Sequence, residues 1–520
     1  MSASIAGPAT VPPPGVSDAP AEAFAVLRKG LAAARFDEPT VAARLGVPSL
    51  YDVKRIADGR KTLTGTPEDA NAVLVRLLID GEPVPTSLVE RLLGSELLAA
   101  LSTLGLVAAG DGSAELIATA ALYPTQGLWL ASDRHPMRVA DFDTVAQDYV
   151  FSALNSLTQR FLHVVPDAPG GRVLELCAGT GVAALRAVRR GAAEAWATDI
   201  APRCVDFARF NVRLNDLADR VRVVESDAWS ALGGETFDLV VAHPPYVPAL
   251  AHRYDFRDGG ADGEQVARRI LEGVAAHVRP GGRYVMVAAL SDRRGAAIAT
   301  RVREWLGTDG DAFDIVVLEN GEYGPMEAYR NVTKGGKDFI DCERWLRHFD
   351  ALGVERFAVS IVELRRDAEG RAPITERRVA GRAPDYRAVD WVFRWARRAA
   401  LAGPTPDARL EGQRPRVAPG ARLAVHLESD QSGDWHTIGA AIETGWPTHA
   451  VVKAPPLAPT LLELCDGTRD VAAILAGLRA AGLVVGDVTR ADVAHLVEVL
   501  AAAAAVELAD CPIPRADGDT

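Results

Sequence analysis

Hydrophobic positions divide the chain into three regions of different periodicity. From about Ala23 to Ala109, apolar residues recur every three or four positions between Gly and Pro breaks, which predicts an all-α domain. From Phe151 to Arg366, wholly apolar runs alternate with amphipathic stretches. From about Arg422 to Leu508, two strand-like runs precede helical ones, which predicts a winged-helix-like C-terminal domain.

The central region has the pattern of an α/β domain. We predict strands at Arg172–Cys177, Ala193–Thr198, Val221–Glu225, Phe237–Ala242, Gly282–Ala289, Phe313–Leu318 and Arg356–Leu364. Helical patterns separate the first five, at about Val182–Arg190, Pro202–Leu214 and Glu264–Val278. Strands that are apolar throughout are buried on both faces, so the pattern predicts a Rossmann-like sheet of seven mostly parallel strands covered by helices.

Breaks in periodicity predict the domain boundaries. The first residues are rich in Pro, Ala and Ser without a period, which is typical of a disordered tail. The predicted segments are the tail 1–22, a helical domain 23–112, a bridging hairpin 113–150, the α/β domain 151–367, a linker with one helix 368–421, the winged-helix-like domain 422–510 and a tail 511–520.

Composition narrows the class of protein. The chain has 57 Lys and Arg against 69 Asp and Glu, a net charge of −12, which disfavours nucleic acid as a partner although an Arg-rich stretch at 365–416 keeps RNA open. Five scattered cysteines form neither a disulfide framework nor a metal-ligand spacing. The N-terminus lacks the pattern of a signal peptide and no apolar run is long enough to cross a membrane, so we expect a soluble cytoplasmic protein.

The candidate chemistry begins where the first central strand ends. Glu175-Leu176-Cys177-Ala178-Gly179-Thr180-Gly181 runs from an apolar strand into a glycine turn that opens a helix, where a ligand can approach the backbone closely. Asp199 closes the next strand at the spacing of a ribose-binding acid, and Asp227 follows the third. Acids at three consecutive strand ends favour a nucleoside-like ligand over incidental loop acids, and Trp229 is a candidate cover for its ring.

These residues resemble class I S-adenosylmethionine-dependent methyltransferases. The segment Glu175–Gly181 matches that family's first motif, Asp199 its ribose-binding acid and Asp227 its adenine contact. The resemblance implies S-adenosyl-L-methionine as the cofactor. It assigns cofactor contacts to Thr158, Glu175, Cys177, Ala178, Gly179, Thr180, Gly181, Asp199, Ile200, Asp227 and Ala228.

A second motif points to a subgroup. His243-Pro244-Pro245-Tyr246 follows the fourth strand and resembles the N/D-P-P-Y motif of release-factor glutamine and ribosomal-RNA guanine-N2 methyltransferases, in their actinobacterial-type multidomain form. The resemblance implies that these four residues hold a nitrogen nucleophile for methyl transfer. Tyr254 and Arg257, on the following loop, and Tyr123, on the bridging hairpin, are candidate substrate contacts.

His243 departs from that motif, which has Asn or Asp at this position. A neutral imidazole offers one acceptor and one donor, so it can orient a nitrogen or remove a proton from a hydroxyl or an amine. The third interpretation is a structural histidine hydrogen-bonded at the strand end. A metal role is disfavoured because no second ligand lies at helical or hairpin spacing.

Three functions therefore remain open. The first is N-methylation of a protein side chain or another amine, and the second is methylation of a small molecule or modified peptide with His243 as base. The third is a cofactor-binding protein without turnover, which the intact glycines and acids disfavour. The segment Leu461–Leu475 resembles peptide-capturing winged-helix modules of modified-peptide biosynthesis, although the pattern favours a stabilising appendage.

Overall fold

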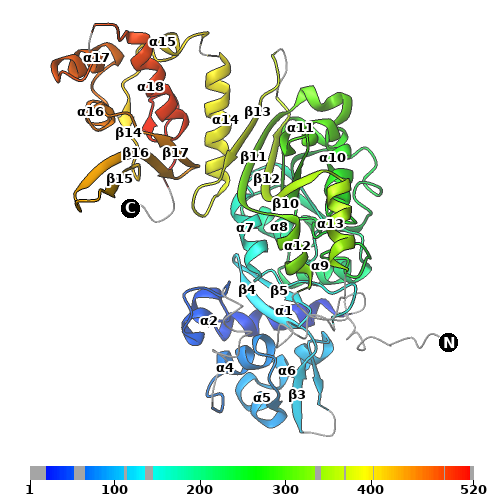
Figure 1. The fold of residues 1–520 in the computed structure, drawn as a ribbon. Helices are drawn as coiled ribbons and strands as arrows, with labels where there is room; N and C mark the ends of the chain where they lie inside the picture. The colour runs from blue at the N-terminus through cyan, green and yellow to red at the C-terminus, as the bar shows by residue number, and fades with distance from the viewer. Residues whose placement is uncertain are drawn as a thin grey trace. The chain divides into compact units, whose positions relative to one another are not determined.

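The computed structural model describes residues 19–51, 65–110, 114–134, 145–333, 341–367, 371–401, 403–484 and 486–515 (Figure 1). Most of the predicted tails 1–22 and 511–520 lies outside these ranges. The chain divides into two compact units. Residues 1–312, 322–359 and 364–367 belong to the first unit, and residues 313–321, 360–363 and 368–520 to the second.

The central feature is an eight-stranded sheet of order β13-β11-β12-β10-β9-β6-β7-β8. Its strands are β6 (Arg172–Leu176), β7 (Glu194–Asp199), β8 (Val221–Glu225), β9 (Phe237–Ala242), β10 (Val278–Arg293), β11 (Asp314–Tyr323), β12 (Val354–Arg365) and β13 (Thr375–Val379). The pairs β6–β7, β6–β9, β7–β8 and β9–β10 are parallel. Reciprocal hydrogen bonds of Arg366 with Gly281 and Gly282 place the end of β12 beside the start of β10, so β12 runs antiparallel. The predicted Rossmann-like fold is confirmed.

The strand number differs from the prediction of seven. The eighth strand, β13, pairs in parallel with β11 and lies in the segment that we interpreted as a linker. Its sequence Thr375-Glu-Arg-Arg-Val379 carries no apolar run because β13 is an edge strand with half-exposed or exposed side chains.

Helices lie on both sides of the sheet (Figure 1). They are α7 (Ser156–Val164), α8 (Val182–Arg189), α9 (Pro202–Leu214), α10 (Gln265–His277), α11 (Ile298–Trp305), a 3-10 turn (Gly307–Ala312), α12 (Pro325–Thr333) and α13 (Cys342–Ala351). The three helices predicted between the first strands correspond to α8, α9 and α10. In α9, Pro202 occupies the first helical turn, where its missing N–H leaves no hydrogen bond unmade.

The N-terminal region is helical but not entirely so. Its elements are α1 (Ala21–Ala33), α2 (Glu38–Leu45), α4 (Ala70–Leu74), a π-helix (Val75–Ile79), β1 (Val84–Pro85), α5 (Thr86–Leu93), α6 (Ser95–Thr103), β2 (Val107–Ala109) and β3 (Glu115–Ala118). The three strands form a sheet of order β1-β3-β2, which corrects the all-α prediction. Strands of two to four residues are too short to give a visible alternation of apolar and polar positions.

The second unit carries its own small sheet. Its elements are α14 (Tyr386–Leu401), α15 (Pro406–Arg409), β14 (Arg416–Val417), β15 (Arg422–Ser429), β16 (Trp435–Gly445), β17 (His449–Lys453), α16 (Ala458–Leu464), α17 (Val471–Ala480), α18 (Arg490–Ala502) and β18 (Val506–Glu507). Strands β15, β16 and β17 form an antiparallel sheet. Within the described ranges, no helix combines the length and apolarity that crossing a membrane requires.

A hairpin of β4 (Ala121–Thr125) and β5 (Leu128–Ser132) is held on α9 by two asparagines. The Asn211 amide accepts from the Ala131 N–H at 2.6 Å and donates to the Ala131 carbonyl and, at 3.0 Å, to the Thr180 carbonyl. One turn later, Asn215 makes the same pair of bonds with the backbone of Trp129. These side chains complete the hydrogen bonds of an edge strand and tie it to the glycine turn after β6.

Replacing Asn211 with Ala should loosen this hairpin. The substitution leaves two buried carbonyls and one N–H without partners, which we expect to cost about 3 kcal/mol and to lower Tm by roughly 5–10 °C. Arg209→Ala is the matched control on α9, because its contact with Asp206 at 3.8 Å is exposed. Equal melting temperatures of the two variants in a thermal scan would contradict this role.

Candidate active site

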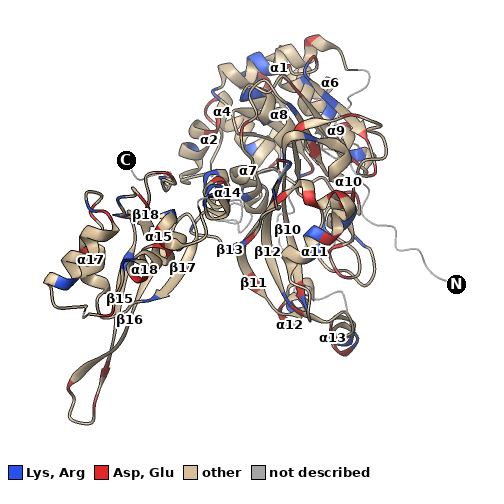
Figure 2. Ribbon diagram, turned by 90° about the horizontal axis from the view of Figure 1, so that it is seen from above, with Lys and Arg blue, Asp and Glu red and all other residues tan. Residues whose placement is uncertain are grey.

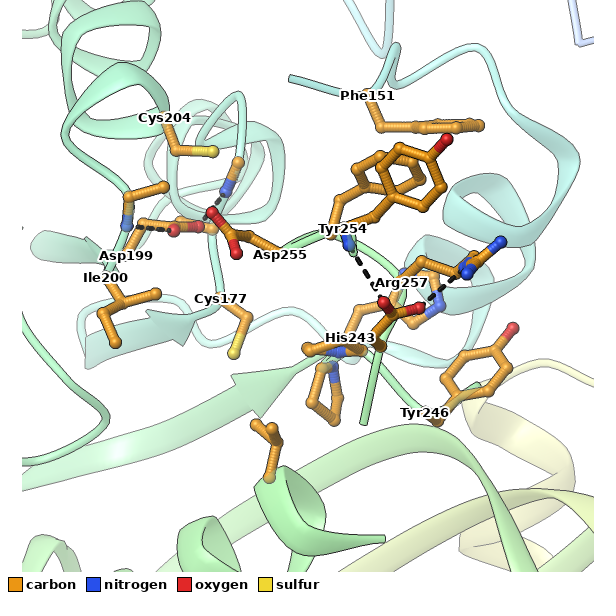
Figure 3. Close-up of a pocket in the computed structure, with 18 of the residues that line it drawn as sticks. Phe151, Cys177, Asp199, Ile200, Cys204, His243, Tyr246, Tyr254, Asp255 and Arg257 are labelled. Atoms are coloured by element: carbon orange, nitrogen blue, oxygen red, sulfur yellow. Dashed lines mark hydrogen bonds and ion pairs between the residues drawn. The ribbon is translucent and has the colours of Figure 1, made fainter. Parts of the chain in front are cut away.

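A cavity of about 670 Å³ lies at the carboxyl ends of the central strands (Figure 3). Its walls come from the turn after β6, the ends of β7 and β8, the segment after β9, and residues 148–161. Figure 3 shows Cys177, Asp199 and Ile200 towards one end and His243 and Tyr246 towards the other. A cavity of this size suits a small molecule, and the ends of parallel strands are where α/β folds place their ligands.

The glycine turn leaves free space beside its backbone, on one side of the cavity. Gly179 has φ +52, and a Cβ added to it would meet nothing within 4 Å. Cys177 adopts the same left-handed conformation at φ 52, which is uncommon for a residue with a side chain. Burial and the nearby carboxylates raise the pKa of the Cys177 thiol far above its usual range, so this thiol stays protonated.

Glu175 lies buried beneath this turn. Its carboxylate accepts from the N–H groups of Ala183 at 3.1 Å and Ala184 at 2.8 Å, in the first turn of α8. Burial raises the pKa of Glu175 to about 8, although these two hydrogen bonds oppose the rise. Glu175 therefore anchors the helix to the strand end while lining the pocket.

Asp199 links the ends of two strands. Its carboxylate accepts from the Gly179 N–H at 2.9 Å and from the Ala201 N–H at 3.0 Å. Burial raises the pKa of Asp199, and these backbone donors oppose the rise. The neighbouring Ile200 is 57% exposed and lines the cavity, which leaves an apolar surface beside the carboxylate.

Asp227 lies at the cavity rim after β8. It forms an ion pair of 2.6 Å with Arg269 of α10, and both side chains are about half exposed. Trp229, the predicted ring cover, lies elsewhere. Its indole stacks on His277 with centroids 4.6 Å apart and donates to the Ile270 carbonyl, so it packs between β8 and α10.

His243 directly follows β9, whose last residue, Ala242, pairs with Leu176 at the end of β6. Its ring stacks on Phe161 of α7, with centroids 5.3 Å apart, and lies 6.0 Å from the Tyr246 ring. Burial lowers the pKa of His243 to about 4, so its imidazole is neutral at pH 7. Among the described residues, neither ring nitrogen has a hydrogen-bond partner, which leaves both free for a ligand.

The loop after the His243–Tyr246 segment is held by one buried carboxylate. Asp258 accepts from the N–H groups of Arg253 at 2.7 Å and Tyr254 at 2.9 Å, and pairs with Arg257 at 2.7 Å. The Arg257 guanidinium also covers the ring of Tyr254 at 4.7 Å. Arg257 and Tyr254 therefore shape the wall through their contacts with each other and with Asp258.

Removing the Asp258 carboxylate should free this loop. Two backbone N–H groups lose a charged acceptor worth about 1.5–3 kcal/mol each, so we expect amide exchange over 252–258 to accelerate at least tenfold in Asp258→Ala. Glu272→Ala, which removes an exposed pair with Arg268 on α10, is the control. Unchanged exchange rates in the loop would show that other contacts hold it.

The cavity brings together most of the predicted site residues. Thr158, Glu175, Cys177, Ala178, Gly179, Thr180, Asp199, Ile200, Asp227, Ala228, His243, Pro244, Pro245, Tyr246, Tyr254 and Arg257 line it. Gly181 lies behind the wall at φ +75, where a Cβ would lie 3.1 Å from Leu185. Tyr123 is also not part of the wall, because it is buried in the hairpin and its hydroxyl accepts from the Ala153 N–H at 2.8 Å. Packing, rather than substrate contact, is its role in this geometry.

The sequence predicts Tyr254 as a site residue but not the aromatic wall to which it belongs. Tyr149, Phe151, Tyr254 and Phe256 form a chain of ring contacts with centroids 5.4–5.8 Å apart and line the cavity. The sequence also does not predict Phe161 as a site residue. Phe161 lies about one turn after Thr158 in α7, so the two side chains lie on the same face of that helix. Within the described ranges, no three His, Cys, Asp or Glu side chains gather as a metal site.

Comparisons with known proteins concern this part of the chain. Residues 142–305 match the family "Methyltransferase small domain". The release factor glutamine methyltransferase of Gloeobacter violaceus is 29% identical over 27% of this chain and 57% of its own length. The ribosomal protein uL3 glutamine methyltransferase of Bradyrhizobium diazoefficiens is 35% identical over 21% of this chain and 38% of its own. A solved ribosomal protein L11 methylase from Lactobacillus delbrueckii subsp. bulgaricus is 15% identical over 37% of this chain and 70% of its own, with a TM-score of 0.23.

These matches support a class I S-adenosylmethionine-dependent methyltransferase domain in residues 142–305, of the group that contains the release-factor and uL3 glutamine methyltransferases, at modest identity. The chain spans about half of the length of these curated relatives. The methyltransferase family match supports S-adenosyl-L-methionine as the cofactor of this domain. The cavity fits that molecule, since the open space above Gly179 admits a close ligand, the Asp199 carboxylate suits ribose hydroxyls and exposed Ile200 offers an apolar face for a base.

Proposed function

We propose that this protein transfers a methyl group to a nitrogen nucleophile, on a protein side chain or another amine, held beside His243-Pro244-Pro245-Tyr246. The observation that carries the proposal is a neutral imidazole with free ring nitrogens in the same cavity as the cofactor turn. The names of the two curated relatives described above specify glutamine as the residue, which supports a protein side chain as the acceptor here.

Different residues of the cavity would bind the cofactor and orient the methyl acceptor. The turn 178–181, Glu175 and Asp199 hold the methionine and ribose parts, and Asp227 with Ala228 holds the adenine. S-adenosyl-L-methionine supplies a methyl group that is already activated, because its sulfur is positively charged. The chain then needs to orient the acceptor and exclude water. His243, fixed by stacking on Phe161, accepts a hydrogen bond from the acceptor nitrogen and aims its lone pair.

A base role for His243 is weaker in this geometry. An imidazole whose pKa is about 4 takes a proton from a hydroxyl or phenol poorly near neutral pH. The aromatic wall nevertheless favours a second candidate, a flat small molecule or modified peptide that stacks on Phe151 and Phe256. RNA ranks lower because the chain carries a net charge of −12.

The flanking regions complete the proposal. We propose that residues 422–510 form a winged-helix-like module, supported by a three-stranded sheet next to helices α16, α17 and α18. For residues 23–112 we propose a mainly helical domain, which includes the short strands β1 and β2 beside its helices. We also propose a cytoplasmic location, the compartment in which a protein or amine acceptor would meet the enzyme.

Methyl transfer to fractionated lysate tests the acceptor. The protein is incubated with tritiated S-adenosyl-L-methionine and separate protein, RNA and small-molecule fractions. Label in the protein fraction, absent with His243→Ala, supports the proposal, and label in the small-molecule fraction supports the second candidate. Label in RNA alone would overturn both.

A further inference from the structure

The second unit presents an open sheet edge. In the described part of the chain, β15 is the outer strand of the sheet β15-β16-β17, and only β16 pairs with it. Figure 2 shows the β15–β16 hairpin extending well beyond the other strands of its own sheet. An outer strand of eight residues leaves every second backbone N–H and carbonyl available to another strand.

One face of this hairpin is apolar and exposed. Leu423, Val425 and Leu427 alternate along β15 and are 38%, 53% and 52% exposed. Trp435, opposite Ser429 in β16, lies on the same face and is 68% exposed. The other face of β15 carries Arg422, Ala424, His426 and Glu428, so the large apolar side chains gather on one face and are not the chance exposure of a single residue.

We propose that β15 pairs antiparallel with β15 of a second copy of this chain, about a two-fold axis through Val425. Such pairing joins two three-stranded sheets into one of six strands. It satisfies the open backbone edge of both copies and covers part of each apolar stripe.

The sequence of β15 selects this register. Paired residues share a face of the sheet, so a two-fold axis between two residues would set apolar side chains against polar ones. An axis on Val425 instead pairs Val425 with its own counterpart and Leu423 with Leu427. An axis on Val425 also pairs more residues of β15 than an axis on Ala424 would.

Charge complementarity supports the same axis. With Val425 at the centre, Arg422 of each copy lies opposite Glu428 of the other, so the favourable pair occurs twice. An axis on Ala424 or His426 would lose both pairs. The contact is small, so we expect weak association in the micromolar range rather than a permanent dimer.

Cysteine cross-linking tests the register in the full-length protein. Paired Cα atoms in antiparallel strands lie about 4.5–5.5 Å apart, within the range a disulfide spans, so Val425→Cys should cross-link on mild oxidation. Leu423→Cys is the matched control, because its two copies lie about 14 Å apart in this register. Oxidation of the unaltered protein measures the cross-linking by its natural cysteines, of which Cys177 and Cys342 are partly exposed. Equal cross-linking of the two variants would overturn the proposal.

Charge reversal gives an independent readout in sedimentation. Arg422→Glu should weaken dimerisation about tenfold, because it sets two acids opposite each other at both ends of the contact. Adding Glu428→Arg should restore the dissociation constant to within about threefold of the original. The proposal would be overturned if the unaltered protein were a monomer at about 100 µM, which is also the result expected if a strand of another protein occupies the edge. It would also be overturned if the dissociation constant of the dimer did not change in these variants.

Discussion

Asp199→Ala should bind S-adenosyl-L-methionine about 100-fold more weakly than the unaltered protein. The substitution removes the acceptor of the Gly179 and Ala201 N–H groups and the carboxylate proposed to hold the ribose. Losing hydrogen bonds to a charged group costs about 1.5–3 kcal/mol each, and about 2.8 kcal/mol corresponds to 100-fold in the dissociation constant. Isothermal titration calorimetry with the purified variant measures this dissociation constant.

The control separates this effect from general damage to the fold. Asp206→Ala removes another aspartate of the same region, on α9, whose half-exposed side chain pairs with Arg209 at 3.8 Å. We expect its affinity to stay within twofold of the original. If the Asp199 variant, shown to be folded by circular dichroism, kept normal affinity, the assignment of the ribose site would be wrong.

His243→Ala should leave cofactor affinity unchanged and lower turnover about 100-fold. The imidazole follows β9, which β6 separates from β7 and Asp199, and its proposed task is to orient the acceptor, an effect that commonly reaches this size. His243→Asn should recover part of the rate, because an amide oxygen is also an acceptor. Methyl transfer to the acceptor fraction measures turnover, and normal turnover in His243→Ala would remove His243 from the mechanism.

The pH dependence follows from the lowered pKa of His243. Since only the neutral imidazole accepts a hydrogen bond, and its pKa is about 4, this contribution should be constant from pH 8 down to about pH 5. Below that range the rate should fall as the imidazole gains a proton. A fall centred near pH 6.5 would instead indicate a histidine with its ordinary pKa.

The cofactor half of the site was predictable because its residues are local in sequence. A strand end, a glycine turn and the next strand end recur at spacings set by parallel strand geometry, which brings Glu175, Gly179 and Asp199 together. Gly181 lines no part of the cavity, because it caps the N-terminus of α8.

The acceptor half was less predictable because it depends on long-range packing. Tyr149 and Phe256 are 107 residues apart and meet only in the folded chain. Likewise, the bonds from Asn211 to Ala131 join segments 80 residues apart, and an asparagine inside a helix carries no signal for such a partner. Strand β13 escaped prediction because an edge strand need not be apolar.

A crystal structure with S-adenosyl-L-homocysteine tests the central claim most directly. The account predicts that the molecule fills the 670 Å³ cavity, with its ribose hydroxyls at Asp199 and its sulfur on the side facing His243. A crystal grown at saturating ligand in which this cavity is empty, or in which the molecule is bound elsewhere, would contradict it.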